Sequence, residues 1–232
     1  MNVLKQLWCS TLGKKYIMAG SGCLLLLFVL GHLAGNLQVF LGPDAINAYG
    51  HFLQSKPGMV WAARLGLLFL VSIHILSAVQ LTRANRAARP SGYAGNPNPP
   101  AASYASRTMM MSGLIIAVFI LYHLLHFTVQ AKGINLLGGT DFKSMTDAEG
   151  RHDVFRMMVA GFTQPLVAGF YLVAMALLCL HLSHGISSMF QSVGIRGCCP
   201  RSLDLGARVV AGLIFLGYAS IPVAILVFRY GR

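Results

Sequence analysis

The chain has 232 residues, of which 56% are hydrophobic and only 10% are charged, and its mean hydropathy is +0.65. Charged residues make up about 25% of a typical soluble domain, so this composition excludes an ordinary soluble globular protein and indicates a membrane protein. The formal net charge of +12 does not indicate a nucleic-acid-binding protein, because the basic residues stand beside hydrophobic segments.

Five segments are apolar and long enough to cross a hydrocarbon core of about 30 Å, which takes about 20 helical residues. They are residues 17–41, 60–82, 108–131, 165–191 and 209–228. The first is much longer than the apolar part of a secretory signal and has no clear cleavage site after it, so we predict that it is retained. The sequence therefore predicts an all-α integral membrane protein with one domain, residues 1–232, and no internal repeat.

The connections between these segments differ in charge, and this difference predicts the orientation in the membrane. The N-terminal segment and the second-to-third and fourth-to-fifth connections carry almost only basic residues, among them Lys14, Lys15 and Arg83. They are predicted to face the cytoplasm. The other two connections mix acidic and basic residues and are predicted to face outward. We therefore expect a multi-pass protein of the bacterial inner membrane with its N terminus in the cytoplasm and its C terminus outside.

Two connections have further features. Residues 86–107 are rich in Pro, Gly, Ser and Ala, which predicts an irregular cytoplasmic loop. Residues 153–162, DVFRMMVAGF, form an amphipathic run that is predicted to lie along the outer interface before Pro165 opens the fourth span. The five cysteines lack the spacings of a structural zinc site or of covalent haem attachment, and we interpret them as structural.

Ionisable residues within a span are costly and by default mark a functional site, and in these spans they are almost all histidines. One histidine lies about three residues past the midpoint of each of the first four spans: His32, His74, His123 and His181. Because the spans alternate in direction, His32 and His123 are predicted to lie in the outer half of the membrane. His74 and His181 are predicted to lie in the inner half.

Two neutral imidazoles at one depth on facing helices can hold a six-coordinate haem iron without a covalent link to the porphyrin. The two pairs therefore predict a bundle around two b-type haems, separated along the membrane normal by about 10 Å or more. Such a protein would carry electrons across the bilayer.

Other readings of the histidines stay open, because a single intramembrane histidine is often a hydrogen-bonding partner between helices. His126 and His184 each follow a predicted ligand by three residues and could be ligands instead, although contact with a propionate or a hydrogen bond is preferred. His51 could lie beside a quinone near the outer haem. Lys14, Lys15 and Arg83 could anchor helix ends or pair with haem propionates.

The segment GHLAGNLQVF (31–40) surrounds the first of these histidines with small residues. Gly35 lies one turn from His32 on nearly the same face, where the lack of a side chain would let a porphyrin or another helix approach. Asn36 is placed to form a hydrogen bond nearby.

With the histidines placed, the chain resembles the membrane-anchor cytochrome b subunit of succinate dehydrogenase and fumarate reductase, in its single-chain form with five helices and two haems. The resemblance is carried by LGKK (12–15), GHLAGNLQVF (31–40), NAYGHFLQ (47–54), IHILSAVQL (73–81), LYHLLHF (121–127) and, most specifically, HLSHGISSMFQSVG (181–194). It implies haem ligands at His32, His74, His123 and His181, the same four that the depths predict.

The resemblance also implies partners. A flavoprotein subunit would interconvert succinate and fumarate, and an iron-sulfur subunit would dock on the cytoplasmic face, in a complex able to dimerise. Electrons would pass through the haems to or from menaquinone or ubiquinone. This chain would not itself react with succinate, because it has no dinucleotide fingerprint and no acid-base cluster in a soluble domain.

Two rival classes remain. One is the di-haem cytochrome b of another quinone-linked enzyme, such as a formate dehydrogenase or a hydrogenase. The other is a transporter or channel that uses intramembrane histidines for protons or metal ions. The spans contain no Asp or Glu, which disfavours the transporter.

Overall fold

The computed structural model describes residues 3–88, 104–134, 141–197 and 199–232. Within these residues, five helical segments are long and apolar enough to cross a membrane. They are α2 (Thr11–Leu37) with the 3-10 turn Gln38–Leu41, α4 (Pro57–Ala87), α6 (Met109–His123) with the π-helical turn Leu124–Thr128, α8 (Pro165–Ser192) and α9 (Pro200–Leu226). The predicted all-α, five-span architecture is confirmed.

Three of these helices, α2, α4 and α9, begin or end several residues beyond the predicted spans, and α4 runs from Pro57 to Ala87 where residues 60–82 were predicted. α2 begins at Thr11 rather than at residue 17, and Ser10 caps it by accepting a hydrogen bond of 2.9 Å from the Gly13 N–H. α9 begins at Pro200 rather than at residue 209. Hydropathy marks only the apolar part of a helix, whereas the backbone hydrogen bonds continue into the polar turns before it.

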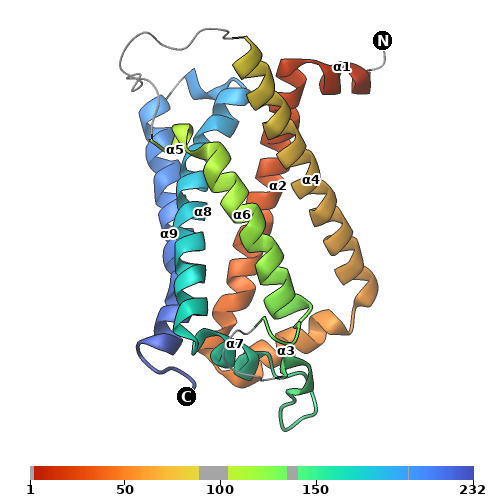
Figure 1. The fold of residues 1–232 in the computed structure, drawn as a ribbon, viewed down its shortest axis with the longest axis vertical. Coiled ribbons are helices and arrows are strands. Elements are labelled where there is room, and N and C mark those ends of the chain that lie inside the picture. Colours follow the sequence, from red (N-terminus) through yellow and green to blue (C-terminus); the bar gives the residue numbers. More distant parts are fainter. Residues whose placement is uncertain (1–2, 89–103, 135–140, 198) are drawn as a thin grey trace.

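Within the described residues, four short α-helices lie between or before the long ones: α1 (Val3–Cys9), α3 (Pro43–Gln54), α5 (Tyr104–Arg107) and α7 (Val154–Phe162). α1 lies at one end of the bundle, and α3 and α7 lie across the other, where the C terminus is also found (Figure 1). These ends are called the α1 end and the α3–α7 end below. Five crossings thus separate the two termini, as expected from the number of spans.

The structure describes all of the predicted amphipathic run 153–162 and part of the predicted irregular loop 86–107. The amphipathic run 153–162 forms α7, and the side chain of Asp153 caps this helix by accepting from the Arg156 N–H at 2.9 Å. Most of the predicted irregular loop lies outside the described residues, and its two edges are helical, at the end of α4 and in α5. α3 was not anticipated, since its segment was interpreted only as a connection.

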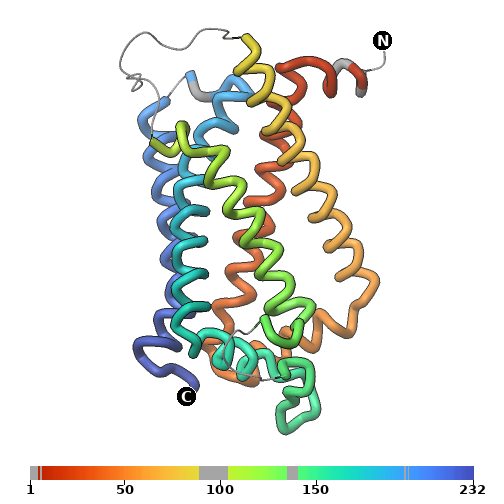
Figure 2. Tube along the Cα trace, in the orientation of Figure 1, coloured from red at the N-terminus to blue at the C-terminus, as the bar shows by residue number. Residues whose placement is uncertain are grey.

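The long helices pack as two pairs that meet at the centre of the bundle. α2 packs along α4, α6 packs along α8, and α2 and α8 touch each other. α9 packs along α8 and contacts α2 as well, and the chain trace shows α9 and α4 on opposite sides of the bundle (Figure 2). The four helices with predicted ligands are therefore arranged as α2–α4 and α6–α8.

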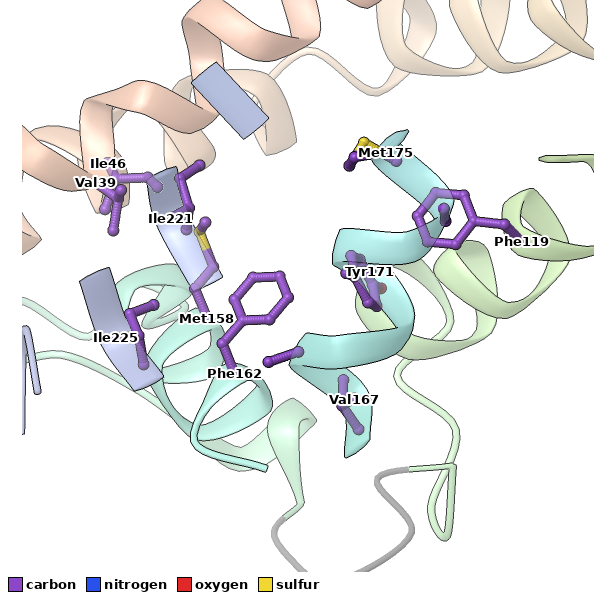
Figure 3. Close-up of a cluster of buried hydrophobic side chains, with 12 residues drawn as sticks. Val39, Ile46, Phe119, Met158, Phe162, Val167, Tyr171, Met175, Ile221 and Ile225 are labelled. Carbon is purple, nitrogen blue, oxygen red and sulfur yellow. The ribbon is translucent and has the colours of Figure 1, made fainter. Parts of the chain in front are cut away.

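The main apolar core lies toward the α3–α7 end (Figure 3). Its buried side chains come from α3, α6, α7, α8 and α9, and include Ile46, Phe119, Phe162, Tyr171 and Ile225. Elsewhere the long helices expose large apolar side chains, as expected of surfaces that face lipid.

A polar clamp joins α3 to the segment before α7, and it consists of Asp44, Asn47, Asp147, Arg151 and Asp153. The buried Asn47 amide donates hydrogen bonds of 3.2 Å to the carboxylates of Asp147 and Asp153. Arg151 forms ion pairs of 2.8 Å with both Asp44 and Asp147. These contacts hold α3 and α7 together across the end of the bundle.

Candidate functional site

The four predicted ligand histidines lie in two pairs. The ring centroids of His32 on α2 and His123 on α6 are 5.7 Å apart, with their planes at 79°. Those of His74 on α4 and His181 on α8 are 6.5 Å apart, with their planes at 59°. Each pair joins the α2–α4 half of the bundle to the α6–α8 half. The structure thus brings the rings together in the predicted combination, and their role as ligands stays a prediction.

Serine hydroxyls hold both rings of the His74–His181 pair. The Ser21 Oγ on α2 lies 3.0 Å from the His74 Nδ1, and the Ser112 Oγ on α6 lies 3.3 Å from the His181 Nδ1. Both serines are buried. Because a serine oxygen lies beside the Nδ1 of each ring, Nε2 is the ring nitrogen that is left to serve as a ligand.

A glycine follows each of these serines and faces the same ring. A Cβ on Gly22 would lie 3.3 Å from the His74 Cε1, and a Cβ on Gly113 would lie 3.4 Å from the His181 Cε1. The glycines therefore leave room for the ring edges, and a larger residue at either position would crowd the ring.

These residues belong to a repeat that the sequence analysis missed. The pattern S-G-x5-F-x3-H occurs once on α2, with Ser21, Gly22, Phe28 and His32, and once on α6, with Ser112, Gly113, Phe119 and His123. In both copies the phenylalanine stacks on the histidine of its own helix, with ring centroids 5.4 Å apart on α2 and 5.9 Å apart on α6. The equal spacing of the two copies was the signal in the sequence that could have revealed them.

The structure shows which of the two expected uses the small residues of GHLAGNLQVF have beside His32. Gly35 makes room for α3, because a Cβ there would lie 2.9 Å from the ring of Tyr49, and Gly31 has nothing within 4 Å of such a Cβ. Asn36 donates a 2.7 Å hydrogen bond to the His32 carbonyl, one turn back along the helix. The glycine at one turn from the histidine thus serves helix packing, the second of the two uses predicted for it.

His126 lies in the π-helical turn Leu124–Thr128 that follows α6. The Val129 N–H bonds to the Leu124 carbonyl at 2.7 Å, and such π turns are frequent at functional sites. The Tyr171 hydroxyl lies 3.0 Å from the His126 Nδ1 and 3.4 Å from the His123 Nδ1. His126 is buried, with its ring centroid 4.0 Å from that of Phe127. This environment favours the hydrogen-bonding role that the sequence analysis preferred for it.

The remaining candidate residues are His184, His51 and the basic residues near the helix ends. His184 is half-buried on α8, one turn after His181, and His51 is exposed on α3. The basic residues predicted to anchor helix ends or to pair with propionates lie near the start of α2 (Lys14, half-buried, and Lys15, exposed) and near the end of α4 (Arg83, exposed). Figure 1 shows both of these helix ends at the α1 end of the bundle.

Tyr218 on α9 is a neighbour of the His32–His123 pair that the sequence analysis missed, because the fifth span has no histidine. Its ring centroid lies 6.2 Å from that of His32, and its hydroxyl donates a 2.8 Å hydrogen bond to the Val29 carbonyl. A tyrosine in an apolar span needs such a partner for its hydroxyl, which is the signal that could have identified it.

The centroid separations of both ring pairs are compatible with an iron held between the two rings. A metal–imidazole bond is about 2 Å long, and a ring nitrogen lies about 1 Å from its ring centroid, so two rings that bind one iron from opposite sides have centroids about 6 Å apart. The observed separations are 5.7 Å and 6.5 Å. The glycines that face the second pair add space at the ring edges.

The fold and the paired rings define a class: a multi-pass helical membrane protein with histidines facing each other between helices. The family model for the succinate dehydrogenase/fumarate reductase transmembrane subunit matches residues 82–221, more than half of the chain. The chain belongs to this family. The matched region contains His123 and His181, whereas His32 and His74 precede it. Comparisons with curated proteins and with solved structures gave no significant match.

Proposed function

We propose that this chain is the di-haem cytochrome b subunit of a succinate:quinone oxidoreductase or quinol:fumarate reductase, and that it carries electrons between an iron-sulfur subunit and membrane quinone. The observation that supports this most directly is the pairing of intramembrane imidazoles at two places, with centroid separations of 5.7 Å and 6.5 Å. Membership of the succinate dehydrogenase/fumarate reductase family supplies the type of complex.

His32 and His123 would hold one haem, and His74 and His181 the other. A bound haem b supplies a one-electron couple between ferric and ferrous iron. Phe28 and Phe119 stack on the rings of the first pair and limit their rotation. The serines restrain the rings of the second pair.

The two ends of the bundle would have different partners. The basic α1 end would face the cytoplasm of a bacterial cell and receive the iron-sulfur and flavoprotein subunits. Lys14, Lys15 and Arg83 would anchor the helix ends there or pair with haem propionates. The quinone, menaquinone or ubiquinone, would react within the membrane, and His51 at the α3–α7 end remains a candidate contact for it.

A reduced-minus-oxidised visible spectrum of the purified chain tests the proposal. We expect b-type bands and two haems per chain. His32→Leu and His123→Leu should each remove one spectral and redox component, and His74→Leu and His181→Leu the other, because each variant removes one of the two imidazoles that would hold that haem.

The exposed His51 provides the matched control, since His51→Leu should retain both haems. A wild-type chain without b-type bands would contradict the proposal. Loss of the same component in His32→Leu and His74→Leu would contradict the assignment of the pairs.

A further inference from the structure

We infer that Ser21 and Ser112 are positioning residues for the His74–His181 pair, and that each hydroxyl oxygen accepts the Nδ1–H of one ring and so directs the Nε2 lone pair into the space between the rings. The consequence for haem rests on the proposed function, because Nε2 would then be the iron ligand.

The hydrogen count at Ser21 sets the direction of its contact with His74. A hydroxyl has one hydrogen to donate and two lone pairs to accept. The Ser21 Oγ lies 2.7 Å from the Ile17 carbonyl oxygen, which can only accept, and 3.0 Å from the His74 Nδ1. The Met18 carbonyl oxygen lies 3.2 Å from the same Oγ and is a second acceptor for the hydroxyl hydrogen. In the arrangement that we infer, the hydroxyl hydrogen goes to one of these carbonyls and the ring nitrogen donates to the hydroxyl oxygen.

The same count applies at Ser112. Its Oγ lies 3.1 Å from the Met109 carbonyl oxygen and 3.3 Å from the His181 Nδ1. A neutral imidazole with its hydrogen on Nδ1 has its lone pair on Nε2. Both rings of the pair are therefore held in the tautomer that ligates metal through Nε2.

The glycine after each serine leaves room for the edge of the same ring. A Cβ on Gly22 would lie 3.3 Å from the His74 Cε1, and a Cβ on Gly113 would lie 3.4 Å from the His181 Cε1. Nδ1 and Cε1 are neighbours in the ring, so the serine and the glycine of one step face adjacent ring atoms. The serine–glycine pair occupies the same place in the repeat on α2 and on α6, so the two rings have nearly equivalent surroundings.

The His32–His123 pair is held differently. The hydroxyl near its ring nitrogens is that of Tyr171, which lies 3.4 Å from the His123 Nδ1 and closer, at 3.0 Å, to the His126 Nδ1. A change at Ser21 or Ser112 should therefore affect one haem site and leave the other unaltered.

An acceptor at Nδ1–H makes the imidazole a more basic ligand and fixes its ring orientation. A more basic ligand stabilises the oxidised iron, so loss of the hydroxyl should raise the midpoint potential of that haem. The angle between the two ring planes, 59° for this pair, should also change, and the low-spin ferric EPR signal reports that angle.

Redox titration and EPR of the solubilised chain test the inference in Ser21→Ala, Ser112→Ala and the double variant. The components are assigned beforehand with His74→Leu and His32→Leu. We expect each alanine variant to raise the midpoint potential of the component that His74→Leu removes, the double variant to raise it further, and the other component to stay at its wild-type value. Ser72→Ala is the control, because Ser72 is exposed on α4 and bonds to its own Leu68 carbonyl.

Loss of only the His74-dependent haem in an alanine variant, with a normal amount of chain, would also support the inference. Wild-type potentials and EPR signals in both alanine variants, or an equal effect on both haems, would overturn it. A wild-type chain that binds no haem would instead overturn the proposed function, so the two failures are distinguishable.

Discussion

Tyr171 connects two histidines that stand three residues apart at the end of α6. Its hydroxyl is within 3.4 Å of the His123 Nδ1 and 3.0 Å of the His126 Nδ1, while the His123 ring also lies against His32 on α2. The π-helical turn widens the helix just where His126 occurs. The two histidines therefore have separate tasks, since one meets a ring from the other half of the bundle and the other is enclosed with Tyr171 and Phe127.

This difference predicts opposite effects of leucine at the two positions. His123→Leu should abolish one of the two haems, because its site would keep only the His32 imidazole. His126→Leu should retain both haems but destabilise the chain by about 1–3 kcal/mol, because the buried Tyr171 hydroxyl loses a partner. Haem content from the pyridine haemochrome spectrum and thermal unfolding in detergent measure the two effects. If His126→Leu lost a haem and His123→Leu kept both, His126 would be the ligand and the assignment of His123 would be wrong.

At the level of elements, glycines set how closely the helices approach. α9 docks on α2 where Gly217 meets Leu33, and a Cβ at this glycine would lie 2.9 Å from the Leu33 Cδ2. Tyr218, the next residue, reaches the Val29 carbonyl of α2. The close approach at Gly217 therefore brings Tyr218 of α9 next to His32.

Gly217→Val should separate the two helices and destabilise the chain by about 1–3 kcal/mol, the usual cost of overpacking. Gly212→Val is the matched control on the same helix, because a Cβ at Gly212 meets nothing within 4 Å. Thermal unfolding of the detergent-solubilised variants gives the comparison. Equal melting temperatures for the two valine variants would show that α9 does not depend on this contact.

The polar clamp that joins α3 to the segment before α7 should make stability depend on pH. Partial desolvation acts to raise the pKa of Asp147, but the hydrogen bonds and the charge of Arg151 outweigh it and hold the pKa of this carboxyl below its usual range. A carboxyl whose pKa is depressed by folding stabilises the fold at pH values above its unfolded pKa, near 3.9. This stabilisation is lost as the pH falls through the lower, folded pKa.

We therefore expect the wild-type melting temperature to fall as the pH drops below about 4, and this fall to be smaller in Asp147→Asn, which has no carboxylate to protonate there. Glu149→Gln serves as the control, because Glu149 pairs with the same Arg151 from an exposed position at 3.2 Å. Melting curves between neutral pH and pH 3 give the result. If Asp147→Asn lost as much melting temperature in acid as the wild type does, the polar clamp would not be the cause of the acid sensitivity.

At the scale of the whole molecule, the bundle has a basic end and an end of mixed charge. The start of α2, with Lys14 and Lys15, and the end of α4, with Arg83, lie at the α1 end. The polar clamp lies between α3 and α7 at the other end. Short basic segments remain on the cytoplasmic side of a membrane. The charge distribution therefore predicts that the α1 end is cytoplasmic and that the clamp faces outward.

A membrane-impermeant maleimide applied to intact cells tests this orientation with single-cysteine variants. A chain that keeps only the exposed Cys9 of α1 should label only after the cells are opened. Glu149→Cys in a chain without native cysteines should label in intact cells, because Glu149 is exposed at the α3–α7 end. The reverse labelling pattern would invert the topology and the proposed docking side.

The sequence by itself determined the features that run along the chain. The lengths of the apolar runs specify five spans, and the positions of His32, His74, His123 and His181 within alternating spans predict which rings meet, because depth follows directly from residue number in a helix. Helix ends were less predictable, since hydropathy reports the apolar portion and not the capped turns beyond it.

Only the tertiary structure decided which faces of the helices touch. Ser21 bonds to His74 across 53 positions of sequence, Gly35 receives the ring of Tyr49, and Tyr171 reaches His126. Lipid tails are as apolar as a helix interface, so the pattern of apolar residues does not tell the lipid-facing side of a membrane helix from the buried one. The small and polar residues that make these contacts acquire their meaning only when the neighbouring helix is in place.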